Sequence, residues 1–202
     1  MINKQFRLIA DFNIEQLANY LRKNVAMTEY NIQVAPFGQV YQSLKKQSNK
    51  QWGSLIWTAP ERILPNFYKA FNLESVDSKA LLSDVDDFSQ AIIDNTDGQT
   101  VFVASWQLPA HYRGYGMLEW KPSLGITQLL AQCNLRLSER FSDNDNIFLL
   151  DSTRWLQGIA EPYNSKMWYA AKVPFVMQVL EHAANDIAAM CDGISGKSRR
   201  LI

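Results

Sequence analysis

The sequence predicts an α/β fold, a three-layer α/β/α sandwich around a parallel sheet of about five strands. Short apolar runs alternate with segments in which apolar residues recur at helical spacing, the pattern of βαβ units. The first run, FRLIAD at residues 6–11, is apolar enough to be buried on both faces, as strands of parallel sheets are. We therefore expect helices on both faces of the sheet and the first strand at its centre.

Five runs have the length and composition of strands. They are 6–11, 31–36, 54–59, 99–106 and 146–151. The chain has 202 residues, 47% of them apolar, with no low-complexity tract and no internal linker. These properties predict one large domain rather than two small ones, and we assign it to residues 1–196.

The helix after the first strand is predicted from one apolar face. This face consists of Ile14, Leu17, Ala18, Leu21 and Val25. Asn13 is suited to be its N-cap, and Glu15 lies in the first turn, where the positive end of the helix dipole favours an acid.

Further helices are expected over residues 77–94 and 126–141, and from Pro174 to Asp192, because their apolar residues also follow helical spacing. The segment 60–71 contains Pro65, which is expected to break a helix there.

Charge and cysteine content exclude several classes of protein. Twenty Lys and Arg residues balance twenty Asp and Glu residues, and the only cationic cluster is the short run 197–200, so we expect no nucleic-acid partner. No apolar run approaches the ~20 residues of a membrane span, and no signal peptide is evident, so we expect a cytoplasmic protein without a membrane partner. Cys133 and Cys191 cannot form a disulfide framework, and both are expected to be structural.

The segment ALLSDVDDFS at residues 80–89 superficially matches the nucleophile motif of haloacid-dehalogenase (HAD) phosphatases. Its apolar residues have helical spacing, however, which places Asp84, Asp86 and Asp87 on a solvated helix face. We therefore expect no catalytic Asp pair in this segment. Metal-binding spacings such as CxxC or HExxH are also missing, and no Gly-rich phosphate loop follows a predicted strand, so the sequence indicates neither a metal nor a cofactor.

Polar residues that follow the predicted strands are candidates for a ligand site, because ligands of open parallel sheets bind at the carboxyl ends of the strands. The expected substrate-binding set is Asp11, Asn13, Thr58, Trp106, His111 and Arg113. We expect them to line one cleft, with Arg113 as an anion contact and His111 as its hydrogen-bonding neighbour. A lone histidine in an aromatic loop can equally be structural, so both interpretations of His111 remain open.

Four stretches resemble the N-terminal region of FkbH-like proteins, the HAD-IIIC phosphatase-like enzymes of polyketide and surface-sugar pathways. They are IADFNIEQLANYLR, VAPFGQVYQSL, FLLDSTRWLQ and, most specifically, MWYAAKVPFVMQVLEHAANDIAAMCDGISGKSRRLI. The resemblance implies an SGNH-hydrolase-like domain of the flavodoxin-like type, with residues 197–202 beginning a linker or strand toward a HAD domain absent from this chain. In that family, the HAD domain handles a phosphorylated three-carbon acid and a glyceryl group is loaded onto an acyl carrier protein.

The resemblance also locates the positions of the hydrolytic residues. SGNH enzymes carry a Gly-Asp-Ser turn after the first strand and an Asp-x-x-His near the last helix. Here the turn is Ala10-Asp11-Phe12, and EPYNSKMWYAAK at residues 161–172 contains no histidine. The resemblance therefore implies a non-hydrolytic module that binds an acyl substrate or an acyl carrier protein and works with a downstream HAD domain.

Two alternatives remain open from the sequence. One is an esterase or acyltransferase with a relocated catalytic set, either His111 with Ser105 or Ser152 with Asp151. The other is a structural interaction domain without a small-molecule site.

Overall fold

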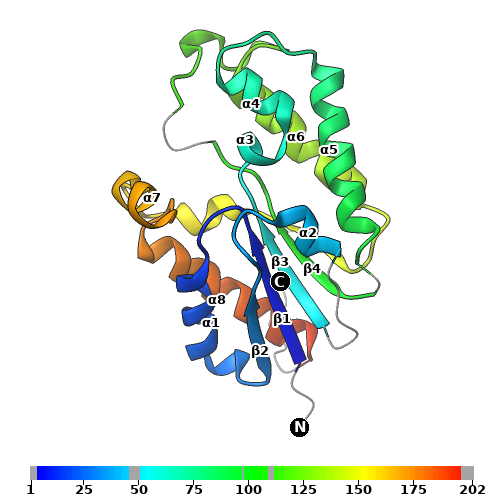
Figure 1. Cartoon of the computed structure of the whole chain (residues 1–202), viewed down its shortest axis with the longest axis vertical. Coiled ribbons are helices and arrows are strands. Elements are labelled where there is room, and N and C mark those ends of the chain that lie inside the picture. Colours follow the sequence, from blue (N-terminus) through cyan, green and yellow to red (C-terminus); the bar gives the residue numbers. More distant parts are fainter. Residues whose placement is uncertain (1–3, 46–50, 97, 109–111, 197–202) are drawn as a thin grey trace.

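The computed structural model describes residues 4–45, 51–96, 98–108 and 112–196. These residues contain a five-stranded sheet in the order β2-β1-β3-β4-β5, and all four strand pairings are parallel. Helices cover both faces of the sheet (Figure 1). The predicted α/β/α fold with a five-stranded parallel sheet is confirmed. His111 and residues 197–202, where the linker was expected, lie outside the described residues.

The observed strands differ from the predicted ones by a few residues at their ends. They are β1 (Lys4–Ala10), β2 (Tyr30–Val34), β3 (Gln51–Trp57), β4 (Thr100–Ala104) and β5 (Ile147–Leu150). β1 is internal, as its apolar sequence requires, but β3 is the middle strand. The predicted central place of β1 is wrong because one strand adds on one side of it and three add on the other.

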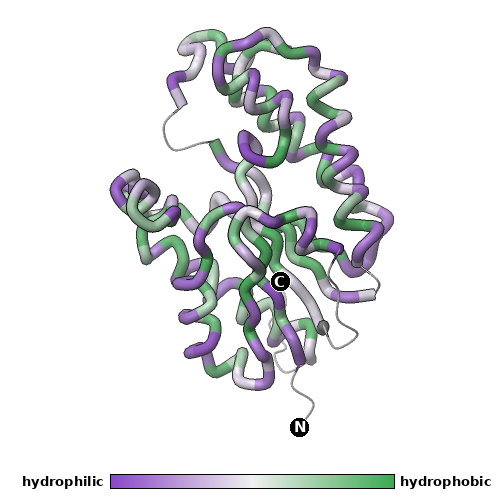
Figure 2. Tube along the Cα trace, viewed as in Figure 1, coloured by the Kyte–Doolittle hydropathy of each residue, from purple (hydrophilic) through white to green (hydrophobic). Residues whose placement is uncertain are grey.

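Alternate residues of the strands build two separate cores. Phe6 and Leu8 of β1 pack with α1 (Glu15–Lys23) and α8 (Met177–Ile194) on one face. Ile9 faces the other core, which is formed with α2 (Val40–Lys45), α5 (Ser78–Ile93) and α6 (Ile126–Phe141). In Figure 2, hydrophobic and hydrophilic residues alternate along the helices, as expected for helices that bury one side.

Six further short helical elements connect the longer ones in the described part of the chain. They are η1 (Val25–Met27), α3 (Pro60–Ile63), α4 (Pro65–Phe71), η2 (Gly116–Leu118), η3 (Ser152–Leu156) and α7 (Ser165–Ala171). The separation of α3 from α4 confirms the predicted break at Pro65. None of the described helices is long and apolar enough to cross a membrane.

The helices predicted over 77–94 and 126–141 are confirmed as α5 and α6, and the Asp77 side chain caps α5 by accepting a hydrogen bond from Lys79 N. The last helix begins at Met177, three residues later than predicted. The preceding segment is extended instead, because Phe175 forms an antiparallel bridge with Tyr163.

The first helix differs from prediction at both ends. Ile14 occupies the N-cap position, although the Asn13 carboxamide oxygen still accepts a hydrogen bond from Glu15 N at 3.2 Å. At the other end, Val25 is 85% exposed rather than part of the apolar face. The α-helix ends at Lys23 and the chain turns into η1, so that Met27 is buried instead.

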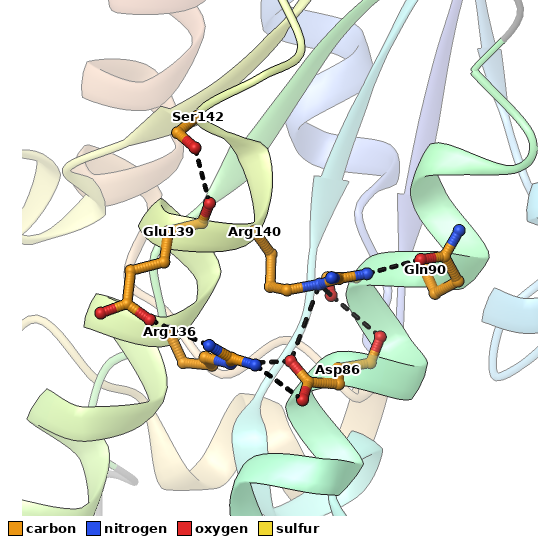
Figure 3. Close-up of polar contacts among 7 residues, drawn as sticks. Asp86, Gln90, Arg136, Glu139, Arg140 and Ser142 are labelled. Carbon is orange, nitrogen blue, oxygen red and sulfur yellow. Dashed lines mark hydrogen bonds and ion pairs between the residues drawn. The ribbon is translucent and has the colours of Figure 1, made fainter.

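The segment 80–89 is helical, as predicted. Two of the carboxylates that were expected on its solvated face, those of Asp84 and Asp86, are only partly exposed. Asp84 is half-buried and accepts hydrogen bonds from Asn66 N at 2.7 Å and from the Asn66 side chain at 3.0 Å. Asp86, with 35% of its side chain exposed, pairs with Arg136 of α6 at 2.8 Å (Figure 3). The expected exposure of both carboxylates is wrong because α4 and α6 pack beside α5 and supply donors.

The two cysteines are free and buried. Cys133 belongs to the core between the sheet and α6, and Cys191 to the core beside α1 and α8. Burial raises the pKa of each thiol to about 12, so each remains protonated at neutral pH. The structural role predicted for both agrees with this placement.

Candidate functional site

A cavity of about 310 Å³ lies at the carboxyl ends of β1, β3 and β4. In Figure 1 this edge is the upper end of the strands, with α3 and α7 next to it. Phe12 lies just after β1, Thr58 just after β3, and Gln107 in the segment after β4, and all three line the cavity. The cavity therefore lies at the sheet edge where the sequence places a ligand site.

Aromatic side chains make up much of the cavity lining. They are Phe12, Trp57, Tyr68, Phe71, Tyr163, Trp168 and Phe175. The lining brings together four parts of the chain, namely the strand ends, α3, α4 and the segment around α7. Such a surface favours apolar ligands or apolar parts of ligands, because burying aromatic and aliphatic area is the main source of affinity.

Phe12 occupies the position at which the resemblance places a catalytic serine. Its side chain is 2% exposed, and its ring packs edge-on against Trp57 and Phe175, with ring centroids 5.3 and 5.6 Å away. The ring is a structural part of the core and of the cavity lining. A hydrocarbon ring has no proton to lose and cannot attack a carbonyl group, so this position cannot supply a nucleophile.

Beside Phe12, two carboxylates share one guanidinium group. Asp11 accepts hydrogen bonds from Ala59 N at 2.8 Å and from Arg62 Nη2 at 3.0 Å. The other terminal nitrogen of Arg62, Nη1, donates to Glu61 Oε1 at 3.1 Å. The guanidinium carbon lies 4.8 Å from the centroid of the Trp168 ring. Arg62 thus links the turn after β1 to α3 and to α7.

Burial dominates the electrostatics of this cluster. It raises the pKa of Asp11, and the charge and hydrogen bond of Arg62 partly offset the rise. Burial also raises the pKa of Glu61, again against the effect of Arg62. The pKa of Tyr163 is raised to about 12 by burial and then by the charge of Glu61. One guanidinium therefore does not fully compensate the two carboxylates.

Three neutral polar side chains of the cavity, those of Thr58, Gln107 and Tyr163, are engaged in structural hydrogen bonds. Thr58 Oγ1 accepts from the Trp106 indole N–H at 3.1 Å, and Tyr163 donates to the Leu108 carbonyl oxygen at 3.1 Å. Gln107 donates to Ser152 Oγ at 2.7 Å. Of the described residues that line the cavity, none is histidine or cysteine. This described lining therefore contains no Ser-His or Cys-His pair for acyl transfer.

The structure distributes the predicted site residues over several environments. Thr58 lines the cavity. Asp11 and Trp106 are buried beside it, where Asp11 accepts a hydrogen bond from Arg62 and Trp106 donates one to Thr58. Asn13 lines a different hollow, which it shares with Lys172. Arg113 is exposed and does not line the cavity. His111 lies outside the described residues. The roles proposed for Arg113 and His111 stay predictions.

Residues that the sequence analysis missed carry the charge and much of the surface of the cavity. Glu61 and Arg62 lie in α3, shortly after the end of β3, in a segment for which the sequence predicted only a break at Pro65. Their position after a strand was the signal that could have identified them, as it identified Thr58. Trp168 and Tyr163 gave no such signal, because they follow η3, far along the chain from any strand end in the cavity.

Of the two relocated catalytic sets proposed for an esterase, the structure describes both members of one, Ser152 and Asp151. Ser152 is fully buried and donates to the Ser105 carbonyl oxygen at 2.7 Å. Asp151 accepts from Thr153 N at 3.1 Å and is exposed, so its carboxylate serves as a cap for η3. His182 lies on α8, where Nδ1 is 3.1 Å from the Trp155 carbonyl oxygen. The Ser152 and Asp151 pair is therefore not assembled.

The sequence matches no protein-family model, and no curated protein matches it in sequence. Among solved structures, the fold is similar to the N-terminal part of the protein BF1531 from Bacteroides fragilis, which contains a phosphatase domain and is complexed with Mg. The TM-score is 0.75 at 16% identity, and the match covers 96% of this chain and 53% of that one. This chain thus spans about half the length of that structure.

Lipases give further structural matches. A GDSL-like lipase from Bacteroides thetaiotaomicron matches with a TM-score of 0.54 at 9% identity, covering 96% of this chain and 89% of the lipase. A lipase from a goat rumen metagenome matches with a TM-score of 0.58 at 9% identity, covering 97% and 99%. Likeness at such low identity establishes the fold and leaves chemistry to the site itself. The fold of this chain is thus similar to that of GDSL-like lipases and of the N-terminal part of BF1531.

Proposed function

We propose that this chain is a non-hydrolytic SGNH-like module of an FkbH-like biosynthetic enzyme. It binds an acyl substrate, or the acyl-bearing arm of an acyl carrier protein, for glyceryl or acyl transfer carried out with a HAD domain outside this chain. The observation that carries the proposal is Phe12, an aromatic ring at the nucleophile position of a cavity that the fold otherwise retains. In this proposal the cavity lies where a hydrolase of this fold has its active site, but it binds the ligand without cleaving it.

The size and lining of the cavity support binding of an acyl group. Its volume of about 310 Å³ is at the lower end of the roughly 300–1,000 Å³ typical of small-molecule pockets. Aromatic rings line it, and they would bury the methylene groups of an acyl chain, each worth about 0.8 kcal/mol when fully removed from water. The cavity therefore suits a short acyl chain better than a sugar or a nucleotide.

The chemistry of the lining argues against hydrolysis. An acyl-enzyme route needs a nucleophilic oxygen or sulfur, a base within hydrogen-bond reach and donors for the oxyanion. Phe12 supplies no nucleophile, and the described lining residues include no histidine to act as base. Asp11 is already committed to Ala59 and Arg62. An autonomous esterase is therefore the weaker alternative.

The phosphatase partner is supported by the comparison with BF1531. That structure contains a phosphatase domain, and its similarity to this chain covers about half of its length. An SGNH-like fold can thus occur in one polypeptide with a phosphatase domain. This arrangement fits a division of labour in which the SGNH-like part binds the acyl group and the HAD domain performs the chemistry.

The test is binding of S-hexanoyl-pantetheine, measured by isothermal titration calorimetry. Trp168→Leu removes a large part of the lining and the ring that stacks on Arg62, so we expect at least about tenfold weaker binding. Trp120→Leu is the matched control, because Trp120 is 69% exposed and does not line the cavity. Equal affinity of both variants and the unchanged protein would contradict the proposed binding site.

Hydrolysis is tested in the same samples with p-nitrophenyl hexanoate. We expect release of p-nitrophenol at the rate of buffer alone. Turnover that is lost in Trp168→Leu but kept in Trp120→Leu would show an esterase in this cavity and overturn the non-hydrolytic assignment.

A further inference from the structure

The structure assigns Glu61 as the specificity-determining residue of the cavity, selecting ligands that present a hydrogen-bond donor at the end of an apolar body and rejecting those with a terminal anion. This inference rests on the proposed function, because it requires that the cavity binds a ligand. It adds the chemistry of the polar end, which the aromatic lining alone does not determine.

The first observation is an unsatisfied oxygen. Glu61 lines the cavity, and its side chain is only 13% exposed. Oε1 accepts from Arg62, whereas Oε2 is buried without a hydrogen-bond partner among the described residues. A buried polar atom without a partner is costly, and because Glu61 lines the cavity, a ligand donor that reaches Oε2 would remove this cost. An N–H or O–H group satisfies this atom, and a carboxylate or phosphate oxygen cannot.

The second observation is the balance of charge. Of the described residues that line the cavity, Arg62 alone is cationic. Its two terminal nitrogens donate to Asp11 and Glu61, and its face lies over Trp168. Lys172 stacks on the same indole at 5.2 Å, but it lines the neighbouring hollow instead. An anionic ligand would therefore have to compete with two resident carboxylates for one guanidinium.

The raised pKa values of Asp11 and Glu61 also favour a ligand that brings a hydrogen-bond donor or a positive charge. Burial raises the pKa of both Asp11 and Glu61, which means that the folded protein holds protons on this cluster more readily than free carboxyl groups do. A ligand N–H dipole or ammonium group supplies the positive charge that a proton would otherwise supply. The aromatic lining is compatible with both, since ring faces attract cations and N–H groups.

The ligand chemistry follows from these three features. An apolar chain ending in an amide or an amine fits the cavity, and a free carboxylic acid or a phosphate does not. An acyl group would accordingly enter as a conjugate whose neighbouring amide N–H reaches Glu61, rather than as the free acid.

The test uses three probes of equal chain length, namely hexanamide, hexylamine and hexanoate, titrated by calorimetry. We expect hexanamide or hexylamine to bind at least about tenfold more tightly than hexanoate. Tighter binding of the amine would identify a charged donor, and tighter binding of the amide would identify a neutral one; both outcomes support the assignment. Hexanoate binding as tightly as the better of the other two would overturn it.

Glu61→Gln is the decisive variant, because it keeps the size of the side chain and removes its charge and one acceptor. We expect the preference against hexanoate to fall to within about threefold, since an amide N–H can bind a carboxylate as well as an oxygen can bind a donor. Glu181→Gln, on the exposed surface of α8, should keep the full preference. A preference unchanged in Glu61→Gln would assign the selectivity to another group.

A second measurement on the unaltered protein guards against a folding defect in the variant. Hexylamine stays protonated below about pH 9, so its affinity should rise with pH as the Asp11 and Glu61 cluster ionises, and an affinity independent of pH would contradict the assignment. Failure of the inference is also distinct from failure of the proposed function. If hexanoate, hexanamide and S-hexanoyl-pantetheine all bind equally, the cavity is a binding site without the role assigned to Glu61. If none of the probes binds, both the role of Glu61 and the proposed binding function are refuted.

Discussion

At the scale of single residues, Phe12 supports the fold and offers no nucleophilic atom to the cavity that it lines. Its ring is almost fully buried and packs on Trp57 and Phe175, which belong to the same core. The ring therefore contributes to stability as a core residue does. A serine at this position would remove the packing, and no histidine is among the described residues that line the cavity to form a catalytic pair with it.

We expect Phe12→Ser to lower the free energy of unfolding by about 3–5 kcal/mol, the usual cost of deleting a buried aromatic ring. Phe148→Ser is the matched control, because Phe148 is 40% exposed on β5, and it should cost much less. Urea unfolding followed by fluorescence measures both. The variant should remain inactive on p-nitrophenyl hexanoate, and a gain of esterase activity would show that a base lies within reach of residue 12.

Glu61 gives a prediction about pH. A carboxyl group with a raised pKa in the folded state contributes stability that is present below its unfolded pKa of about 4.3 and is lost as the pH rises through the folded value. The free energy of unfolding of the unaltered protein should therefore fall relative to that of Glu61→Gln as the pH rises above about 4.3.

Urea unfolding at several pH values measures this difference. Glu181→Gln serves as the control, and its stability should run parallel to that of the unaltered protein over the same range. A difference between the unaltered protein and Glu61→Gln that stays constant with pH would show that the pKa of Glu61 is not raised on folding.

At the scale of elements, α5 and α6 are joined by a polar cluster above their shared apolar contact. Asp86 pairs with Arg136 at 2.8 Å and lies 3.7 Å from Arg140, which also donates to Ser89 and Gln90 (Figure 3). The side chains are about one-third exposed, so solvent weakens these pairs. Each pair therefore contributes little to the stability of the domain.

We expect Asp86→Asn to cause a small loss of stability that disappears in about 1 M NaCl, where the screening length is about 3 Å. Asp87→Asn should cause no loss at either salt concentration, because Asp87 is exposed. Urea midpoints at low and high salt test this pair of variants. An equal loss at both salt concentrations would assign the effect of Asp86 to packing rather than to charge.

On the scale of the whole molecule, the sheet separates two cores, and each contains one of the two cysteines. Cys133 lies on α6 and Cys191 on α8, so the thiols report on opposite faces. Burial raises the pKa of both to about 12 and shields them from reagents. Their reactivity therefore depends on opening of the structure around them.

We expect both thiols to resist iodoacetamide in the folded protein and to become reactive together as urea unfolds it. Peptide mass spectrometry after short labelling pulses gives the free energy of opening at each cysteine. Equal values would show that the two cores unfold as one cooperative unit, as is usual for a domain of this size. Labelling of Cys133 well before Cys191, or the reverse, would show that one face opens independently.

The sequence by itself determined the elements whose burial is periodic. The helices α5 and α6 were predictable because a helix that packs on one side repeats its apolar residues in a local pattern. The strands were predictable as short apolar runs, and the parallel sheet followed from their alternation with helices. The resemblance to SGNH-like domains indicated that Phe12 stands at the position of their catalytic serine, which composition and spacing do not reveal.

Only the tertiary structure decided which distant residues meet. Arg62 reaches Asp11 across 51 positions of sequence, and Asp86 reaches Arg136 across 50, so neither contact leaves a periodic signal. The order of the strands also depends on contacts between distant residues, so the sequence did not show that β3 rather than β1 is the middle strand. For the same lack of a local signal, it did not show that Asn13 and Thr58 line different hollows, although both follow strands. A local pattern records which side of an element is buried, whereas the partner of a charge depends on how the loops at the end of the sheet pack against one another.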